Sequence, residues 1–411
     1  MNKKENKLIP SLRFPEFKNE GEWEDISIDS VGNVITGGTP SKEESEYWGG
    51  DFVWVTAQDF KEKYIYNSVL KLTEKGKERT RVIPKNSILV TCIASIGLNG
   101  INKVECATNQ QINSIVCNTS NHYEFVYYAI SRNIVQLKNL AGQTAVPIIN
   151  KTAFEKFTIQ KPKLPKEQQK IASCLSSLDE VIEAHSQKMD LLKDHKKGLM
   201  QNLFPQEGKK VPKYRFKEFE KDGEWVEKSL GEVGDFVGGG TPDTSKQEYW
   251  DGEILWYTPT EIKNGKLKSS IRKITEQGLK NSSAKLLPKG TILITTRATI
   301  GDVSITEEEC TTNQGFQSLI VHSTEVNTFW LYWILQNKEA LIKRASGSTF
   351  KEIGKNEITN IPTLSPQKEE QQKIASCLSA LDELITAQAE KIEQLKEHKK
   401  GLMQGLFPKV K

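Results

Sequence analysis

Two long segments of the chain carry apolar residues at steps that alternate between three and four, with polar residues between them. In the first segment this seam consists of Ile171, Leu175, Leu178, Ile182, His185, Met189, Leu192, Lys196, Leu199 and Leu203. In the second it consists of Ile374, Leu378, Leu381, Ile385, Gln388, Ile392, Leu395, Lys399, Leu402 and Leu406. An average spacing of 3.5 residues is typical of a coiled coil, so the pattern predicts one long helix over 164–205 and another over 366–411.

The two predicted helices have equal lengths and most simply pair with each other. About 38 helical residues at 1.5 Å each span roughly 57 Å. Because a globular segment of similar size precedes each helix, we expect an antiparallel pair with the globular segments at opposite ends, related by a pseudo-twofold axis. His185 with Gln388, and Lys196 with Lys399, interrupt the apolar seam at matching places. Such interruptions favour register-setting residues or exposed seam ends over partner-binding sites.

The globular segments, 1–163 and 206–365, show short runs of β-branched and aromatic residues bounded by turn-forming residues. These runs predict strands at 51–56, 87–93, 253–258 and 291–296. Helical spacing of apolar residues predicts short amphipathic helices at 123–136 and 328–341. Each globular segment is therefore predicted to be an α+β domain.

The chain is an internal tandem repeat. Gly-Gly-Thr-Pro at 37–40 returns at 239–242, and Gln-Gln-Lys-Ile-Ala-Ser at 168–173 returns at 371–376. Thr-Asn-Gln also occurs twice, at 108–110 and 312–314. Other paired segments share little beyond length, namely 61–82 with 263–286 and 118–148 with 322–352. This contrast indicates one architecture used twice, with surfaces that have diverged.

Charge and composition exclude some classes of protein. The 411 residues include 57 Lys and Arg against 53 Asp and Glu, a net charge of +4, so the chain is no polybasic tail and any basic surface must be local. The longest uncharged run, 86–102, is shorter than the roughly 20 apolar residues of a membrane span. The charged N-terminus resembles no secretory signal. We expect a soluble cytoplasmic protein without membrane contact.

The sequence shows no active site of its own. The glycine runs lack the Gly-Lys-Ser/Thr of a phosphate-binding loop and are better explained as turns. No methyltransferase amine pocket, Gly-rich cofactor loop or metal-ligand spacing occurs, so we expect no catalytic residue, no metal and no cofactor in this chain. Six cysteines show no pairing motif and are expected to be reduced core residues: Cys92, Cys106, Cys117, Cys174, Cys310 and Cys377.

Amides, hydroxyls and a few cations gather on the loops that bound the predicted strands. Asn and Gln can pair with adenine, Arg with guanine, and Ser or Thr with bases or phosphates, so these side chains are candidates for DNA contact. They are Ser41, Lys42, Thr56, Gln58, Asn109, Gln110, Gln143, Thr144, Thr258, Thr260, Arg297, Asn313, Gln314, Ser348, Thr349 and Lys351. Such residues are also common in turns and caps. The tryptophans at 48, 54, 250 and 256 are expected in the core rather than on a base-stacking surface.

The chain resembles the specificity subunits of type I restriction-modification systems. The resemblance rests on Gly-Gly-Thr-Pro-Ser at 37–41 leading to Tyr-Trp-Gly-Gly at 47–50 and a strand, on the echo of this pattern at 239–256, on the repeated helix starts, and on a duplicated layout over nearly all 411 residues. One departure is Asp243, which replaces Ser41 in the second copy, so no base contact is carried over to that place.

The resemblance implies a DNA-specificity subunit that reads a bipartite, asymmetric site in double-stranded DNA. Target recognition domains at 1–163 and 206–365 would each read one half-site, and the helices at 164–205 and 366–411 would set the spacer and dock two modification subunits. Those partners would bind S-adenosylmethionine and methylate adenine at N6. Restriction subunits with motor and nuclease activity would use ATP and Mg²⁺.

Two other classes of function stay open at this stage. The first is a non-enzymatic coiled-coil scaffold that bridges protein partners, and salt-sensitive binding to short duplexes would argue against it. The second is an enzyme with an unrecognised site, which an assay of the isolated chain for methyl transfer or cleavage would reveal.

Overall fold

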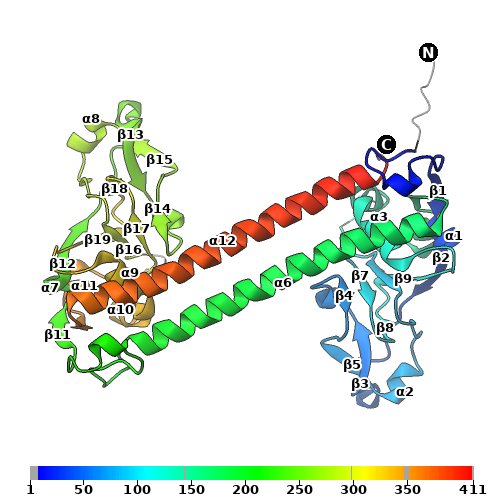
Figure 1. The fold of residues 1–411 in the computed structure, drawn as a ribbon, viewed down its shortest axis with the longest axis horizontal. Helices are drawn as coiled ribbons and strands as arrows, with labels where there is room; N and C mark the ends of the chain where they lie inside the picture. The colour runs from blue at the N-terminus through cyan, green and yellow to red at the C-terminus, as the bar shows by residue number, and fades with distance from the viewer. Residues whose placement is uncertain (1–7, 143–144, 298, 347–350, 410–411) are drawn as a thin grey trace. The chain divides into compact units, whose positions relative to one another are not determined.

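The computed structural model describes residues 8–142, 145–297, 299–346 and 351–409. The chain divides into two compact units, one made of residues 1–186 and 390–411 and the other of residues 187–389. Each unit combines a globular head with parts of two long helices, α6 (Pro165–Leu203) and α12 (Lys368–Leu406) (Figure 1). Neither long helix therefore belongs to one unit alone.

Three sheets build the head of the first unit. The largest has the strand order β2 (Gly32–Thr36), β9 (Ile112–Cys117), β6 (Ile88–Thr91), β7 (Asn99–Asn102) and β4 (Tyr64–Ile65). The second has the order β5 (Leu70–Leu72), β3 (Trp48–Val55) and β8 (Ala107–Thr108), and the third pairs β1 (Glu24–Ser27) with β10 (Thr158–Lys161). The short helices are α1 (Ile28–Val31), α2 (Glu74–Lys77), α3 (Tyr123–Arg132), α4 (Ile134–Asn139) and α5 (Lys151–Glu155).

The head of the second unit repeats this topology. Its largest sheet has the strand order β12 (Gly234–Gly238), β19 (Phe316–Val321), β16 (Ile292–Thr295), β17 (Val303–Thr306) and β14 (Lys266–Leu267). The second has the order β15 (Arg272–Ile274), β13 (Trp250–Tyr257) and β18 (Cys310–Thr312). The third pairs β11 (Val226–Ser229) with β20 (Pro362–Ser365). Its helices are α7 (Leu230–Val233), α8 (Glu276–Lys280), α9 (Asn327–Gln336), α10 (Lys338–Arg344) and α11 (Lys355–Thr359). Both heads also contain 3-10 turns at Pro15–Phe17, Ser45–Tyr47, Ala57–Asp59, Lys217–Phe219, Gln247–Tyr249 and Pro259–Glu261. The α+β class and the internal repeat are confirmed.

Strand boundaries differ from the prediction at β3, at β6 and at β13, which begins at Trp250 rather than at residue 253. β3 begins at Trp48 rather than at residue 51, because its two glycines form part of a bulge in which Trp48 and Phe52 both face Leu72. β6 ends at Thr91, and the residues that follow turn into a loop.

The predicted amphipathic helices are wrong in two respects. Each is broken, at Asn133 and Asn337, where the asparagine side chain donates to the carbonyl oxygen four residues earlier, 2.8 Å away in both heads. In addition, α9 is not amphipathic, because all six residues from Phe329 to Ile334 are buried. This helix packs in one core with the sheet strands and with both long helices, so it has no solvent-facing side over that stretch.

Within each unit the long helices run antiparallel. In the first unit, the start of α6 shares a core with the end of α12, including Leu175 and Leu406, and Asp179 pairs with Lys399. In the second unit, the end of α6 meets the start of α12: Lys196 Nζ lies 2.5 Å from Asp382 Oδ1. Every predicted seam position is buried or half-buried. The two seam lysines thus form matching ion pairs, which agrees with a register-setting role.

A buried ion pair ties each head to the first turn of its long helix. Arg13 donates to both carboxylate oxygens of Glu167, each at 2.7 Å, and Arg215 contacts Glu370 in the same way at 2.9 and 2.7 Å. Both carboxylates are almost fully buried. Bidentate arginine pairs fix orientation as well as distance, so they set the angle at which each head joins its helix.

The cysteines are free thiols in buried or half-buried positions. Burial raises the pKa of Cys92 to about 11 and that of Cys106 to about 12, so these thiols stay protonated and unreactive at neutral pH. None of the helices in the described ranges combines the length and apolar character that crossing a bilayer requires.

Candidate nucleic-acid interface

Two predicted DNA-contacting segments meet at the ends of neighbouring parallel strands. β3 and β8 pair in parallel, with Val55 beside Thr108, and the backbone N–H of Asn109 donates to the carbonyl of Val55 at 3.1 Å. The segments that follow these strands, 56–58 and 109–110, therefore lie side by side. The second head repeats this contact between Asn313 and Tyr257, also at 3.1 Å.

The Gly-Gly-Thr-Pro loop packs directly on the Thr-Asn-Gln loop. Gly38 N–H donates to the Thr108 carbonyl at 2.8 Å, and Thr39 Oγ1 donates to Gln110 Oε1 at 2.5 Å. A Cβ at Gly37 would lie 2.1 Å from Thr108 Oγ1 and 2.2 Å from the Asn109 carbonyl, so only glycine fits. The two repeated motifs are thus contact partners.

The second head preserves these contacts. Thr241 Oγ1 donates to Gln314 Oε1 at 2.6 Å, and a Cβ at Gly239 would lie 2.0 Å from the Asn313 carbonyl. Sequence reasoning missed Thr39 and Thr241 as loop-positioning residues, although their recurrence in both copies was a usable signal.

A third loop, between β6 and β7, joins the same surface. The fully buried Thr91 closes this loop, since its hydroxyl donates to the Ser95 carbonyl and accepts from Leu98 N–H at 3.0 Å. Thr295 does the same in the second head, where its hydroxyl accepts from Asp302 N–H at 3.0 Å. Both threonines were missed, although Thr-x-x-Ala-Ser/Thr-Ile-Gly occurs at 91–97 and 295–301.

The predicted side chains divide into two groups by what they contact. Thr56 and Thr258 cap short turns through Asp59 and Glu261, and Asn109 and Asn313 accept backbone hydrogen bonds that close the loop after β8 and β18. These four residues have structural roles. The exposed candidates are Ser41, Lys42, Gln58, Gln110, Thr260, Arg297, Gln314 and Lys351. Gln143, Thr144, Ser348 and Thr349 lie outside the described residues.

The paired tryptophans hold the loop that begins with Gly-Gly-Thr-Pro through hydrogen bonds to its backbone. Trp48 and Trp54 meet edge to face with ring centroids 4.9 Å apart, and their indole N–H groups donate to the carbonyls of Ser41 and Gly38. Trp250 and Trp256 repeat the arrangement at 5.0 Å. Three of the four side chains are buried, which agrees with the predicted core role.

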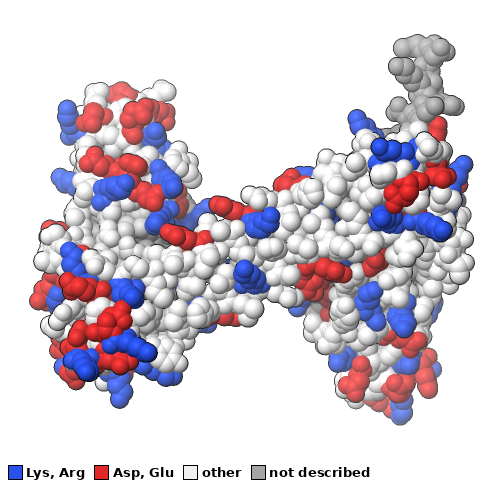
Figure 2. All heavy atoms as spheres, viewed as in Figure 1, with Lys and Arg blue, Asp and Glu red and all other residues white. Residues whose placement is uncertain are grey.

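Two exposed cations beside these loops were missed by sequence reasoning. Arg81 donates to the Thr36 carbonyl at 2.6 Å, and the guanidinium of Arg272 stacks 3.5 Å from the Trp250 ring centroid. Arg272 does not belong to a repeated motif, because Leu70 takes its place in the first head, opposite Trp54 as Arg272 lies opposite Trp256. On the face in view, Figure 2 shows Lys and Arg interspersed with Asp and Glu.

Comparison with known proteins identifies the architecture. A family model described as the type I restriction modification DNA specificity domain matches residues 20–194 and 222–397. The chain belongs to this family. It contains two specificity domains, and the resemblance inferred from the sequence is confirmed.

Individual relatives carry the same description. The chain is 37% identical over 190 residues to the type I restriction enzyme MjaIX specificity subunit of Methanocaldococcus jannaschii, covering 45% of this chain and 44% of that protein. It is 25% identical to the MjaVIII specificity subunit of the same organism, covering 98% and 96%. A crystal structure of the type I restriction-modification S subunit from M. genitalium shares the fold, with a TM-score of 0.64 at 17% identity and coverage of 98% and 100%.

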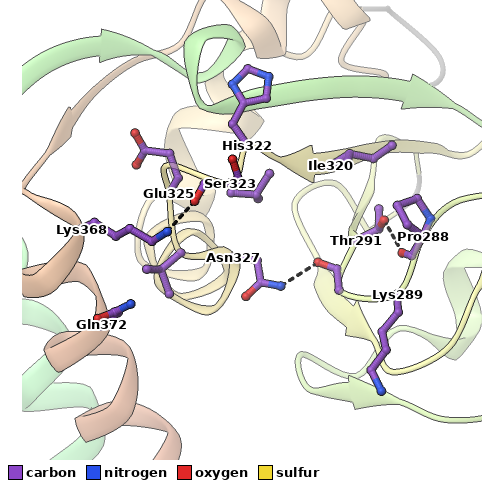
Figure 3. Close-up of a pocket in the computed structure, with 13 residues that line it drawn as sticks. Pro288, Lys289, Thr291, Ile320, His322, Ser323, Glu325, Asn327, Lys368 and Gln372 are labelled. Carbon is purple, nitrogen blue, oxygen red and sulfur yellow. Dashed lines mark hydrogen bonds between the residues drawn. The ribbon is translucent and has the colours of Figure 1, made fainter.

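A pocket of about 340 Å³ in the second specificity domain lies away from the loops (Figure 3). It borders the start of β16 and the end of β19, which is the opposite end of the sheet, and Lys289, Glu325 and Lys368 line it. Burial raises the pKa of Glu325, but hydrogen bonds from Lys228 and Gln371 outweigh this effect, and the pKa lies below its usual range. The pocket is therefore separate from the candidate interface.

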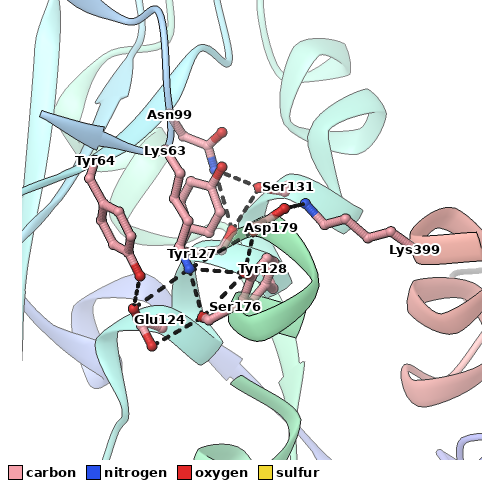
Figure 4. A network of polar contacts seen from close by, with 10 residues as sticks. All are labelled: Lys63, Tyr64, Asn99, Glu124, Tyr127, Tyr128, Ser131, Ser176, Asp179 and Lys399. Atoms are coloured by element: carbon pink, nitrogen blue, oxygen red, sulfur yellow. Dashed lines mark hydrogen bonds and ion pairs between the residues drawn. The ribbon is translucent and has the colours of Figure 1, made fainter. Parts of the chain in front are cut away.

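A buried polar network joins the first specificity domain to the long helices (Figure 4). Lys63 Nζ donates to Ser176 Oγ at 2.7 Å and Tyr128 OH at 2.9 Å, and lies 3.6 Å from Glu124 Oε1 and 3.9 Å from Asp179 Oδ2. Burial lowers the pKa of Lys63, and the charge of Glu124 opposes that shift. The network links an edge strand of the domain to α6.

The second specificity domain has a simpler junction. Tyr332 OH donates to Asp382 at 2.6 Å, as Tyr128 does to Asp179, but Gly265 and Thr328 stand where the first domain has Lys63 and Glu124. A cavity of about 200 Å³ lies there, lined by Val326, Thr328, Gln372, Ala375, Ser376 and Ser379. The two junctions therefore differ in charge and in packing.

Proposed function

We propose that this chain is the DNA sequence-specificity subunit of a type I restriction-modification complex and that each specificity domain reads one half of a bipartite, asymmetric site. One observation carries the proposal: the hydrogen bonds that hold the loops recur in both domains, whereas exposed residues on those loops differ. Two domains with the same loop framework but different exposed residues are suited to reading two half-sites of different sequence.

The divergence is visible at equivalent positions. Ser41 corresponds to Asp243, Ile93 to Arg297 and Ile148 to Glu352. Because hydroxyls, cations and apolar side chains prefer different base edges in the major groove, such exchanges alter the sequence that is read. Identical surfaces would instead read two identical half-sites.

The long helices are proposed to set the spacer and to dock two modification subunits. Helix residues Val181, Leu191 and Leu384 are large apolar side chains with 43%, 70% and 55% exposure, which suits contact with partner subunits. A solved structure at 18% identity and a TM-score of 0.59 concerns complex assembly and conformational transition of the type I R-M system.

Catalysis is proposed to reside in the partners. Modification subunits would bind S-adenosylmethionine and methylate adenine at N6 after extruding it from the duplex, and restriction subunits would use ATP and Mg²⁺. In this assembly the present chain would only recognise the DNA sequence. We propose that the assembly is located in the cytoplasm.

Mapping of N6-methyladenine in cells with and without this chain tests the proposal. A bipartite asymmetric motif should be methylated only when the chain and its modification partner are both present. The purified chain alone should transfer no methyl group. Robust methyl transfer by the isolated chain, or a methylation pattern independent of the chain, would contradict the proposed role.

A further inference from the structure

One pair of backbone positions carries apolar side chains in the first specificity domain and charged side chains in the second. In the first, Ile93 forms an isolated antiparallel bridge with Ile148, and in the second Arg297 forms the same bridge with Glu352. The adjoining hydrogen bonds also match: Ile149 N–H donates to the Cys92 carbonyl at 2.8 Å, and the second domain has an equivalent bond of 3.2 Å. The backbones are thus equivalent, and the difference lies in the side chains.

This bridge lies within the candidate interface of each domain. Cys92 N–H donates to the Gln111 carbonyl at 2.7 Å, and Thr296 N–H donates to the Gly315 carbonyl at 2.9 Å. Each bridge therefore adjoins the Thr-Asn-Gln loop. The buried Thr91 and Thr295 close the loop that carries the first residue of each bridge, so its position is well defined.

The guanidinium of Arg297 is held by a fixed carboxylate. Arg297 Nε lies 2.9 Å from Glu352 Oε1, with the two side chains 49% and 43% exposed. Glu352 is anchored in turn, because its N–H and C=O both bond to Ser346 at 2.9 Å. This ion pair engages Nε, and the described part of the chain shows no hydrogen bond from Nη1 or Nη2.

The geometry favours a base over a phosphate as the ligand of Arg297. A guanidinium fork matches the O6 and N7 acceptors of guanine in the major groove. A phosphate bound at the same place would stand next to the Glu352 carboxylate, and the two anions would repel each other. A neutral base edge carries no such penalty.

The first domain offers an apolar surface at the same position. Ile148 is 49% exposed, and Leu98, from the loop that carries Ile93, is 40% exposed. Apolar side chains contact the C5 methyl group of thymine and provide no hydrogen bond to guanine.

We propose that Arg297, oriented by Glu352, reads a guanine of the second half-site, and that Ile93 with Ile148 contacts a thymine methyl group at the equivalent base pair of the first half-site. This inference rests on the proposed function, and it identifies the residues that make the two words differ at one base pair.

The test is the methylated motif of the variant R297I/E352I, which gives the second domain the apolar pair of the first. Selectivity for guanine at one base pair of the second half-site should fall roughly tenfold to a hundredfold, the usual discrimination of a bidentate contact. The first half-site and the spacer should stay the same. R297K, which keeps the charge but loses the fork, should relax the same base pair.

Two further variants sharpen the result. K268M/E307Q removes another ion pair of 3.4 Å, between an exposed lysine and a half-buried glutamate of the same domain at the opposite end of β17, and should leave the motif unaltered. The reciprocal variant I93R/I148E should introduce a guanine preference at one base pair of the first half-site.

The outcomes separate the two proposals. An unchanged second half-site in R297K or in R297I/E352I, with methylation retained, overturns this inference while the proposed function stands. The inference is likewise overturned if R297I/E352I is inactive and R297K and I93R/I148E leave both words unaltered. Absence of chain-dependent methylation in the wild type overturns both proposals.

Discussion

Gly37 and Gly38 are neighbours in the sequence, but the structure makes very different demands on them. A Cβ at Gly37 would meet the side chain and backbone of the Thr-Asn-Gln loop at 2.1–2.3 Å, whereas a Cβ at Gly38 would have no atom within 4 Å. The first glycine is required by packing, and the second is not. A run of glycines therefore does not identify which member is constrained.

The variant Gly37→Ala should destabilise the first unit by about 1–3 kcal/mol, because overpacking forces two loops apart. It should also weaken recognition of the first half-site and therefore lower methylation of the DNA site. Thermal unfolding of the full chain measures the first effect. Gly38→Ala is the matched control and should behave as wild type. Equal melting temperatures for the two variants would show that the loops can separate without cost.

At the scale of whole elements, the two junctions between domains and helices differ although the helices repeat. The first contains Lys63 among Glu124, Asp179 and two hydroxyls, and the second contains Gly265 beside a small cavity. Lys63 lies just before β4, within a segment that shares little with its counterpart. The divergent segments thus reach the helices as well as the candidate interface.

Replacement of Lys63 by Met should destabilise the first unit by about 3 kcal/mol, because it leaves the largely buried carboxylate of Glu124 without its cation, whereas Asp179 keeps Lys399. The double variant Lys63→Met/Glu124→Leu should recover much of that loss, since an apolar pair can replace a buried ion pair. Denaturation of both variants forms a double-mutant comparison. A double variant no more stable than the single one would show that the pair itself contributes little.

At the scale of the whole molecule, each unit needs both long helices. Leu402 and Leu406 of α12 and the next residue, Phe407, pack in the core of the first unit, although they lie more than 200 residues beyond the rest of it. In the second unit, Leu199 and Leu203 of α6 and the next residue, Phe204, take the corresponding places. A fragment that ends after α6 consequently lacks part of its own core.

Residues 1–205 alone should form a homodimer, because the end of α6 and Phe204 from a second copy can supply Leu199, Leu203 and Phe204 in place of the missing Leu402, Leu406 and Phe407. Light scattering of the purified fragment should give the mass of a dimer. With the modification partner, the dimer should direct methylation to a palindrome of the first half-site. A folded monomer, or methylation of the original asymmetric site, would contradict this expectation.

Insertion of four helical residues after Lys188 and after Lys391 should lengthen the DNA spacer by one base pair. Four residues add about 6 Å and rotate the helix by about 40°. One base pair advances ~3.4 Å and turns ~34–36°, so the rotation matches one base pair and the length nearly two. We expect the match in rotation to decide the spacer, because each domain must face its DNA groove, whereas a coiled coil can bend to absorb a difference in length.

Sequencing the methylated motifs of this insertion variant tests whether the helices set the spacer length. Both half-site words should persist, because no domain residue changes. An unchanged spacer in an active variant would show that the helices do not set it.

The sequence by itself determined the duplication, the two long helices, the α+β class and the loops that form the candidate interface. These features follow from periodicity and from repeated motifs, which are local in the chain. The tertiary structure decided which loops touch: the parallel pairing of β3 with β8 brings Thr56 next to Asn109, and Gly37 fits only because Thr108 lies against it. It also decided that Asn133 and Asn337 break helices and that residues 329–334 of α9 are all buried. Such outcomes depend on contacts between residues far apart in the sequence, and hydrophobic periodicity, a local property, does not contain them.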